Sequence, residues 1–178
     1  MNICAIDDCD KNTSGKSKYC TTHRIEARER FVKMIDEQQN ERNARNEKFA
    51  EVFRNAHVAG FRAAQNCVPE PMIVVQHENP WDSSSAITKV YEPVMDGVCG
   101  FAWINIKPGN SQFANWLKKS AEAGTIHLNV HKSYYGGIDL WVGDFGQSYE
   151  RKRAYANAFA KVIVDELGVK AHSMGRLD

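Results

Sequence analysis

The sequence has no long hydrophobic run, and its N-terminus carries no export signal. No stretch approaches the length of about eighteen apolar residues that a membrane-spanning helix needs, so we expect no membrane association. The chain starts Met-Asn-Ile-Cys, with neither a positively charged start nor an apolar core. The five cysteines are an odd number, which argues against a disulfide framework. We therefore expect a cytoplasmic protein with reduced thiols.

The sequence also lacks an excess of charge of either sign. Its 23 Lys and Arg residues balance 22 Asp and Glu residues, and the net charge is +1 at pH 7. A protein dedicated to binding phosphate groups usually carries an evident basic excess. Any basic surface must therefore be local, or the partner is not a nucleic acid.

Proline is missing from residues 24–66, and Gly60 is the only glycine in this segment. The segment is rich in residues that favour helices, and the sequence CVPEP from Cys67 onward ends it. No large apolar side chain occurs between Asp36 and Lys48, which excludes a strict heptad coiled coil. We predict a solvated helical spacer that docks through apolar residues at both ends.

Residues 67–178 alternate between strand and helix patterns. The order β-α-β-β-α-β predicts a ferredoxin-like domain, with extra strands near residues 72–76 and 86–93. The chain is therefore predicted to be an α+β protein with a zinc knuckle (1–23), a helical spacer (24–66) and this domain (67–178). The six predicted elements are the strands 97–106, 125–131, 136–144 and 169–174 and the helices 110–121 and 148–168.

Three of the five cysteines and one histidine fall within the first 23 residues. Cys4, Cys9, Cys20 and His23 have the spacing Cys-x4-Cys-x10-Cys-x2-His. Zinc prefers four tetrahedral thiolate and imidazole ligands, and two close pairs joined by a loop meet that need. All four positions are filled, so we predict a closed structural zinc site, because a segment this short has no core of its own.

This stretch resembles the small Cys-Cys-Cys-His fingers of bacteriophage proteins, some of which lie at one end of HNH homing endonucleases. The resemblance covers about twenty residues and implies contact with DNA. The chain departs from the pattern after the histidine, where RIEARERF replaces an aromatic-rich stretch. We find no ββα unit with the His-Asn-His set of a catalytic HNH motif.

The C-terminal block, residues 94–178, is similar to a group of uncharacterised bacteriophage proteins. The motifs that carry this resemblance are DGVCGFAWINIKPGNSQFANWLKK, YYGGIDLWV, GQSYERKRAYANAFA and GRLD. The resemblance implies a phage-encoded protein in a bacterial host cell, and it implies no activity.

Strand alternation predicts one unusual sheet face, opposite the two helices. Large aromatic side chains should not gather on an open surface without a partner. Three alternatives remain: the extra strands cover the face, a nucleic acid stacks on its rings, or His127, His131 and Asp139 form a metal or acid–base cluster. The third requires a bent strand, because the histidines lie about 13 Å apart along it. The face is expected to include Phe101, Trp103, Asn105, His127, Asn129, His131, Asp139 and Trp141.

Two local basic features could also bind a partner. Lys107 lies beside the N-terminus of the predicted helix 110–121, where an anion could bind. Arg151 and Arg153 lie at the start of the next helix and could form a basic patch with Arg176.

The leading hypothesis is a non-enzymatic, phage-type accessory protein that binds zinc and a nucleic acid or nucleoprotein partner. Phe101, Trp103, Trp141, Lys107, Arg151 and Arg153 are its candidate contact residues. The alternatives are a protein that inhibits a host defence or transcription system, and a metal-dependent nuclease or hydrolase that uses His127, His131 and Asp139. The sequence leaves the oligomeric state open.

Overall fold

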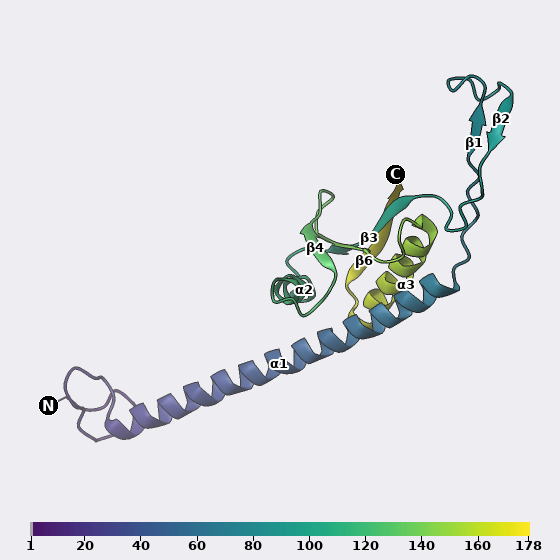
Figure 1. The fold of residues 1–178 in the computed structure, drawn as a ribbon. Coiled ribbons are helices and arrows are strands. Elements are labelled where there is room, and N and C mark those ends of the chain that lie inside the picture. Colours follow the sequence, from purple (N-terminus) through teal and green to yellow (C-terminus); the bar gives the residue numbers. More distant parts are fainter. Residues whose placement is uncertain (1) are drawn as a thin grey trace. The chain divides into compact units, whose positions relative to one another are not determined.

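The computed structural model describes residues 2–178 as two compact units. The first unit ends at Glu47 and the second is Lys48–Asp178. Helix α1 (Thr21–Asn66) contributes residues to both units (Figure 1). Within the described residues, no helix is long and apolar enough to cross a membrane.

The first unit begins with two loops held together by backbone hydrogen bonds. The N–H of Cys4 donates to Lys11 O (3.1 Å), and the N–H of Ala5 donates to Lys18 O (2.9 Å). Helix α1 starts at Thr21, slightly earlier than predicted, which puts His23 in its first turn. The apolar side chains expected to dock at this end of the helix are exposed: Phe31, Met34 and Ile35.

The second unit contains the remaining helices and strands and is of mixed α and β type. It places the C-terminal part of α1 beside a four-stranded antiparallel sheet and two further helices (Figure 1). The elements are β1 (Val75–His77), β2 (Ile87–Val90), β3 (Gly100–Lys107), α2 (Gln112–Glu122), β4 (Asn129–Lys132), β5 (Ile138–Trp141), α3 (Tyr149–Leu167) and β6 (Lys170–Leu177).

The sheet has the strand order β4-β5-β3-β6, and every neighbouring pair is antiparallel. Because side chains alternate along a strand, each register row belongs to one face. One row, Val130–Leu140–Ile104–Ser173, faces the helices, and the hydroxyl of Ser173 donates to Asn157 of α3. The next residue along each strand therefore faces away from them.

Local signals set the ends of α2 and α3. Ser111 caps α2 by accepting a hydrogen bond from Ala114 N–H (3.1 Å). Gly168 ends α3 in the left-handed conformation (φ 63°), where a side chain would be strained. Both ends agree with the sequence prediction.

Aromatic side chains dominate the core between α1, α2 and α3. Phe49 of α1 packs edge-on against Phe113 of α2, with ring centroids 5.3 Å apart. Phe53 packs in the same way against Phe159 of α3 at 5.5 Å. The C-terminal part of α1 is therefore an integral part of the second unit's core.

A buried tyrosine joins α1 to α3. Tyr155 is fully buried, and its hydroxyl shares a hydrogen bond of 2.6 Å with His57 Nδ1. Burial raises the pKa of the Tyr155 phenol, and the nearby Asp144 carboxylate raises it further. The folded protein therefore holds the phenolic proton more tightly than the unfolded chain.

We expect the free energy of unfolding to fall as the pH rises above about 10, where the tyrosine of the unfolded chain ionises first. A single such group contributes a slope of at most about 1.4 kcal/mol per pH unit. The Tyr155→Phe variant should lose about 1 kcal/mol at neutral pH and should show a shallower fall in alkali. Urea unfolding at several pH values measures both. Equal alkaline slopes for the two proteins would contradict the assignment.

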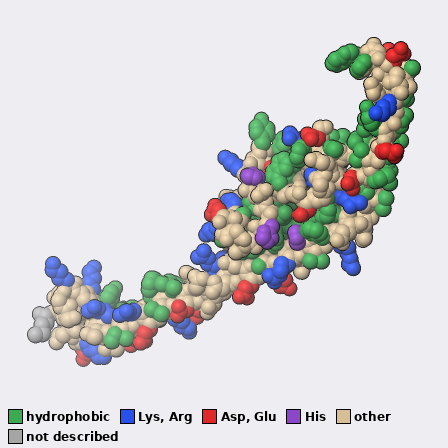
Figure 2. Space-filling view, viewed as in Figure 1, with side chains coloured by type: hydrophobic (Ala, Val, Ile, Leu, Met, Phe, Trp, Pro, Cys, Tyr) green, Lys and Arg blue, Asp and Glu red, His purple; other side chains and the backbone are tan. Residues whose placement is uncertain are grey.

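The strands β1 and β2 form a separate hairpin and do not cover the four-stranded sheet. They pair antiparallel with each other, and β2 is exposed along its whole length. Figure 1 shows the hairpin extending away from the sheet, and Figure 2 shows hydrophobic side chains gathered along it. The alternative in which these strands fold over Trp103 and Trp141 is therefore wrong.

Candidate metal centre

The four residues with ligand spacing come together in the first unit. Cys4 Sγ lies 3.3 Å from His23 Nδ1, Cys20 Sγ lies 3.5 Å from the same nitrogen, and Cys9 Sγ lies 3.9 Å from Cys20 Sγ. All four ligand atoms lie within 4.8 Å of one another. The group is close enough to hold a metal ion.

The start of α1 positions two of these ligands. Cys20 precedes the helix, and its carbonyl accepts the hydrogen bond of Arg24 N–H (3.1 Å). Cys20 and His23 are three residues apart, so their side chains share one face of the first turn. The N–H of Cys20 also donates to Cys4 Sγ (3.3 Å), which joins the two halves of the cluster.

The first loop brings Cys9 into the same group. Asp8 has a positive φ of 63°, a conformation that Asp adopts more readily than most residues. The N–H of Cys9 donates to Ile6 O (3.2 Å), which closes the turn. The geometry therefore comes from a tight turn on one side and a helix start on the other.

Hydrogen bonding favours the thiolate form of Cys4. Burial raises the pKa of its thiol, but hydrogen bonds from His23 and from the N–H groups of Cys20 and Ile6 outweigh that effect. The net result lowers the pKa from 9.0 to about 6. For Cys9, a hydrogen bond from Lys11 N–H lowers the thiol pKa, whereas burial and the neighbouring thiols of Cys4 and Cys20 raise it more strongly. The cluster thus stabilises one thiolate strongly before any cation binds.

The arrangement is that of a closed site. Four ligand atoms from four residues would fill the tetrahedral coordination sphere of one ion and would leave no position for a substrate or a reactive water. Over the described residues 2–178, this is the only group of three or more His, Cys, Asp or Glu side chains placed to share an ion. Cys67 and Cys99 are half-buried and lie outside it.

The predicted cluster of His127, His131 and Asp139 does not assemble as a group of three. Strand β4 starts at Asn129, so His127 precedes it, while His131 and Asp139 are register partners on β4 and β5. The buried carboxylate of Asp139 instead accepts a hydrogen bond from Asn105 Nδ2 (2.6 Å). The structure thus gives Asp139 a partner within the sheet.

The predicted aromatic contact residues do come together. Trp103 and Trp141 are register partners, and their rings stack with centroids 4.7 Å apart and planes 22° apart. The Phe101 ring lies edge-on to Trp141 at 6.2 Å. Trp103 is only 8% exposed, whereas Phe101 and Trp141 are half-buried.

The predicted basic residues are dispersed rather than gathered. Arg151 lies 4.0 Å from Asp96 Oδ1, which gives it an acidic neighbour. Arg153 packs its side chain beside Gly175, on the helix side of β6. Lys107 lies at the end of β3 opposite Lys170, and Arg176 lies over the Phe101 ring at 5.3 Å.

Sequence reasoning did not single out two features of the second unit. Lys170 and Met174 join the aromatic face through β6, and only the register of that strand assigns them there. The bond between His57 and Tyr155 joins residues that are 98 positions apart, for which the sequence offers no signal.

Comparison with known proteins adds nothing to this description. No protein-family model, curated protein or solved structure matches the chain. The functional conclusions therefore depend on the cysteine–histidine group and on the surfaces around it.

Proposed function

We propose that the group formed by Cys4, Cys9, Cys20 and His23 binds zinc as a structural ion. A tetrahedral zinc ion with bonds of about 2.3 Å to sulfur and about 2.0 Å to nitrogen separates its ligand atoms by roughly 3.5 to 3.8 Å. The distances of 3.3, 3.5 and 3.9 Å in this group are close to that range. Three thiolates and an imidazole also favour zinc over hard cations such as Mg²⁺ and Ca²⁺.

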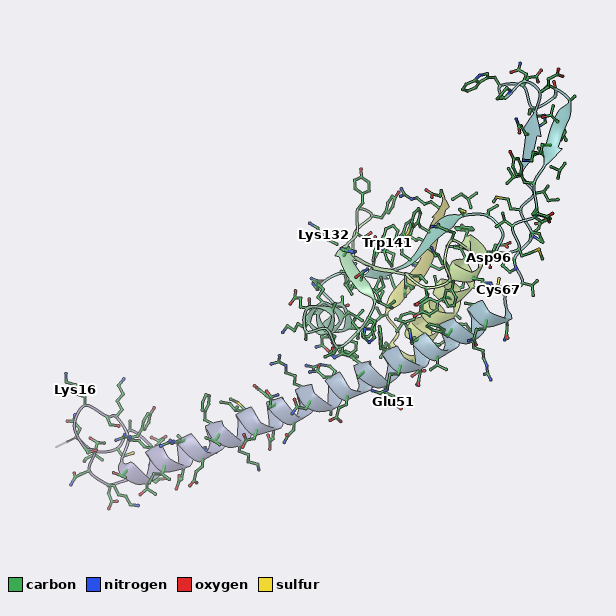
Figure 3. All side chains as sticks on the ribbon, viewed as in Figure 1. Lys16, Glu51, Cys67, Asp96, Lys132 and Trp141 are labelled. Carbon is green, nitrogen blue, oxygen red and sulfur yellow. The ribbon has the colours of Figure 1, made fainter. Side chains whose placement is uncertain are left out.

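We also propose that the protein is a non-enzymatic nucleic-acid-binding protein, in which the zinc orders a basic contact segment. One observation carries this proposal: residues 11–25 contain four exposed cations and no acidic residue, and they are held by the closed cysteine–histidine group. Figure 3 shows one of them, Lys16, pointing outward from the second loop. The acidic residues Asp7, Asp8 and Asp10 belong to the first loop. The four cations are Lys11, Lys16, Lys18 and Arg24.

The local charge resolves the difficulty posed by a net charge of only +1. Phosphate contacts need cations at the interface, and a near-neutral total charge is compatible with them where the contact segment itself carries no acidic residue. Such contacts fix a protein on a nucleic acid without reading its sequence. The proposed role is therefore backbone binding.

We expect the full-length, zinc-loaded protein to bind a labelled DNA duplex with an affinity that falls as salt rises from about 50 to 200 mM. The Lys16→Gln, Lys18→Gln double variant should weaken binding at low salt. It should also reduce the slope of log affinity against log salt by about 1.8 for duplex DNA. Fluorescence anisotropy measures both quantities.

The matched control is Lys33→Gln, Arg45→Gln, which removes two cations of α1 outside the segment. It should bind as the unchanged protein does. Absence of salt-dependent binding to any nucleic acid, or an equal loss in both double variants, would overturn the proposed function.

We also propose that the second unit has a ferredoxin-like fold. Its support is the strand order β4-β5-β3-β6, in which the first and third strands of the β-α-β-β-α-β run are central and all neighbours are antiparallel. The kinship with phage proteins stays a prediction from the sequence motifs.

One observation favours a second candidate function, binding to a protein. The β1–β2 hairpin exposes many large apolar side chains, and Trp81 in the loop between its strands is 95% exposed. Exposed apolar surface of this kind marks interaction sites. Others on the hairpin and its flanks are Ile73, Val74, Ile87, Val90, Tyr91, Val94 and Met95. If this function holds in place of the first, the partner will bind with little dependence on salt.

A further inference from the structure

The sheet of the second unit has one face that no helix covers. We call it the open face, and register and strand alternation assign its members. Three rows run across the strands: His131–Asp139–Asn105–His172, Asn129–Trp141–Trp103–Met174, and Phe101–Arg176. Lys107 and Lys170 continue it beyond the first row.

The opposite face shows why this one is open. Ile104, Ile106 and Leu140 belong to the core formed with α1, α2 and α3, so all three helices lie on that side. The β1–β2 hairpin forms its own sheet and does not close over the other side (Figure 1). Part of the open face is accessible: Asn129, His131, Lys170, His172 and Arg176 are exposed, and Phe101, Lys107, Trp141 and Met174 are half-buried. Trp103, Asn105 and Asp139 are buried.

The centre of the open face is aromatic. Trp141 stacks on Trp103 on one side and has Phe101 edge-on at 6.2 Å, and it remains half-buried rather than enclosed. The indole Nε1 of Trp103 has no hydrogen-bond partner, although this side chain is only 8% exposed. A buried donor without an acceptor is unusual in a native structure.

The charge of the open face is positive. Three Lys or Arg residues of the four strands, Lys107, Lys170 and Arg176, lie on it, and Asp139 is its single acidic residue. The Asp139 carboxylate is buried and bonded to Asn105, so it offers little repulsion to an anion. Arg176 lies 5.3 Å from the centre of the Phe101 ring, which places a cation directly beside the aromatic centre. Lys107 and Lys170 are neighbours at the other end of β3.

We propose that the open face binds a single-stranded nucleic acid, with a base on Trp141 and phosphates at Lys107, Lys170 and Arg176. This inference rests on the proposed function and names a second site and the form of nucleic acid that it takes. Aromatic rings give bases a stacking surface, and flanking cations follow the backbone. A nucleic acid needs both an aromatic stacking surface and flanking cations, whereas a protein partner does not require this combination.

A single strand fits this surface better than a duplex does. The bases of a duplex are already stacked and paired, so they cannot lie on Trp141. Four strands spaced by about 4.8 Å give a face roughly 14 Å wide, enough for a few nucleotides but not for a helical turn.

The test uses the full-length, zinc-loaded protein and a fluorescein-labelled single-stranded DNA of mixed sequence and about 16 nucleotides. Trp141→Ala should weaken binding to this strand by about tenfold. Lys170→Gln, Arg176→Gln should weaken it too and should lower its salt slope by about 1.4. Both changes should affect the matching duplex much less.

The matched control is Lys119→Gln, Lys161→Gln, which removes two exposed cations from α2 and α3 on the helix side. It should bind the single strand as the unchanged protein does. Because Trp141→Ala also removes a stacking partner of Trp103, thermal unfolding checks that the variant is folded; the two charge variants change exposed side chains and test the face independently.

The outcomes separate this inference from the proposed function. If both face variants bind the single strand like the control, the open face is not the site and the inference fails, while the function of residues 11–25 stands. If the variants of Lys16 and Lys18 bind duplex unchanged but the face variants lose the single strand, the inference stands without the basic segment. If the protein binds neither probe, both proposals are overturned and a protein partner is favoured.

Discussion

Removal of the proposed zinc ion should unfold the N-terminal loops and leave the second unit folded. The reason is that residues 2–20 have almost no core: Cys4 and Cys20 are the buried side chains there, whereas Ile3, Ile6 and Tyr19 are exposed. A few backbone hydrogen bonds and the proposed zinc ion must therefore supply the order. Structural zinc contributes about 10 to 16 kcal/mol of apparent binding free energy in zinc-finger peptides, far more than a few exposed hydrogen bonds provide.

The Cys20→Ser variant tests the same prediction by removing one ligand. Cys20 lies at the centre of the group, since its sulfur is 3.9 Å from Cys9 Sγ and 3.5 Å from His23 Nδ1. We expect it to lose about one zinc per chain by elemental analysis. Amide hydrogen exchange should become fast across the first 20 residues and stay unchanged in β3 and α3.

The matched control replaces the two cysteines outside the group, Cys67→Ser and Cys99→Ser. Both are half-buried and neither is a ligand, so the zinc content and the exchange of the first loops should not change. If Cys20→Ser kept its zinc, or if chelation left the protection of residues 2–20 intact, the metal centre would be refuted. The proposed nucleic-acid function would then lose the element that orders its basic segment.

The metal ligands could be predicted because their chemistry is local. Cysteine and histidine at this spacing have few structural roles other than metal binding in a segment without a core, and the structure gathers all four residues. The ends of α2 and α3 were predictable for a similar reason, since Ser111 and Gly168 set them through their own backbone or side chain. Features set by residues close in the sequence can therefore be predicted without knowledge of the tertiary structure.

The strand lengths were less predictable, because tertiary bonds and turns shorten them. Residues 125–131 alternate like a strand, but the N–H and hydroxyl of Thr125 both donate to Ser120 O and hold the chain at the end of α2. Strand β4 consequently starts at Asn129. Strand β5 starts at Ile138 because Gly136 and Gly137 both have positive φ and form the preceding turn.

The fate of the extra strands could not be predicted at all. Residues 72–94 contain enough apolar side chains to suit a second core, and the sequence does not encode the direction in which a hairpin leaves a domain. The same limit applies to α1, in which Phe49, Val52 and Phe53 are buried while Phe31 and Ile35 are exposed. Periodicity identifies an apolar face, but the geometry of the whole chain decides whether anything covers it.

The Gly60→Ala variant should destabilise the second unit, although alanine favours helices by about 1 kcal/mol over glycine. Gly60 lies on the face of α1 that contacts α3, and it is the only glycine within a helix. A Cβ atom at this position would lie 2.6 and 2.7 Å from two carbons of the Tyr155 ring. Such contacts are well inside van der Waals separation, so either the ring or the helix must move.

The ring has no room to move. Tyr155 is fully buried, it is bonded to His57, and it packs against Phe61, Phe145 and Phe159 at centroid distances of 5.8 to 5.9 Å. Overpacking a dense core costs about 1 to 3 kcal/mol, which exceeds the gain in helix propensity. The net loss should lower the midpoint of thermal unfolding by several degrees, at about 2 to 8 °C for each kcal/mol.

A double-mutant cycle isolates the clash from the propensity of alanine. In a Tyr155→Leu background the ring is gone, so Gly60→Ala should cost little or become stabilising, and the two changes should couple by about 1 kcal/mol or more. The control is Ala59→Gly at the neighbouring, half-buried position of α1, which tests helix propensity and should cost about 1 kcal/mol. If Gly60→Ala stabilised the unchanged background, α1 would not approach α3 as closely as described. The glycine would then be an ordinary weak point of a helix rather than the place where the helix meets the core.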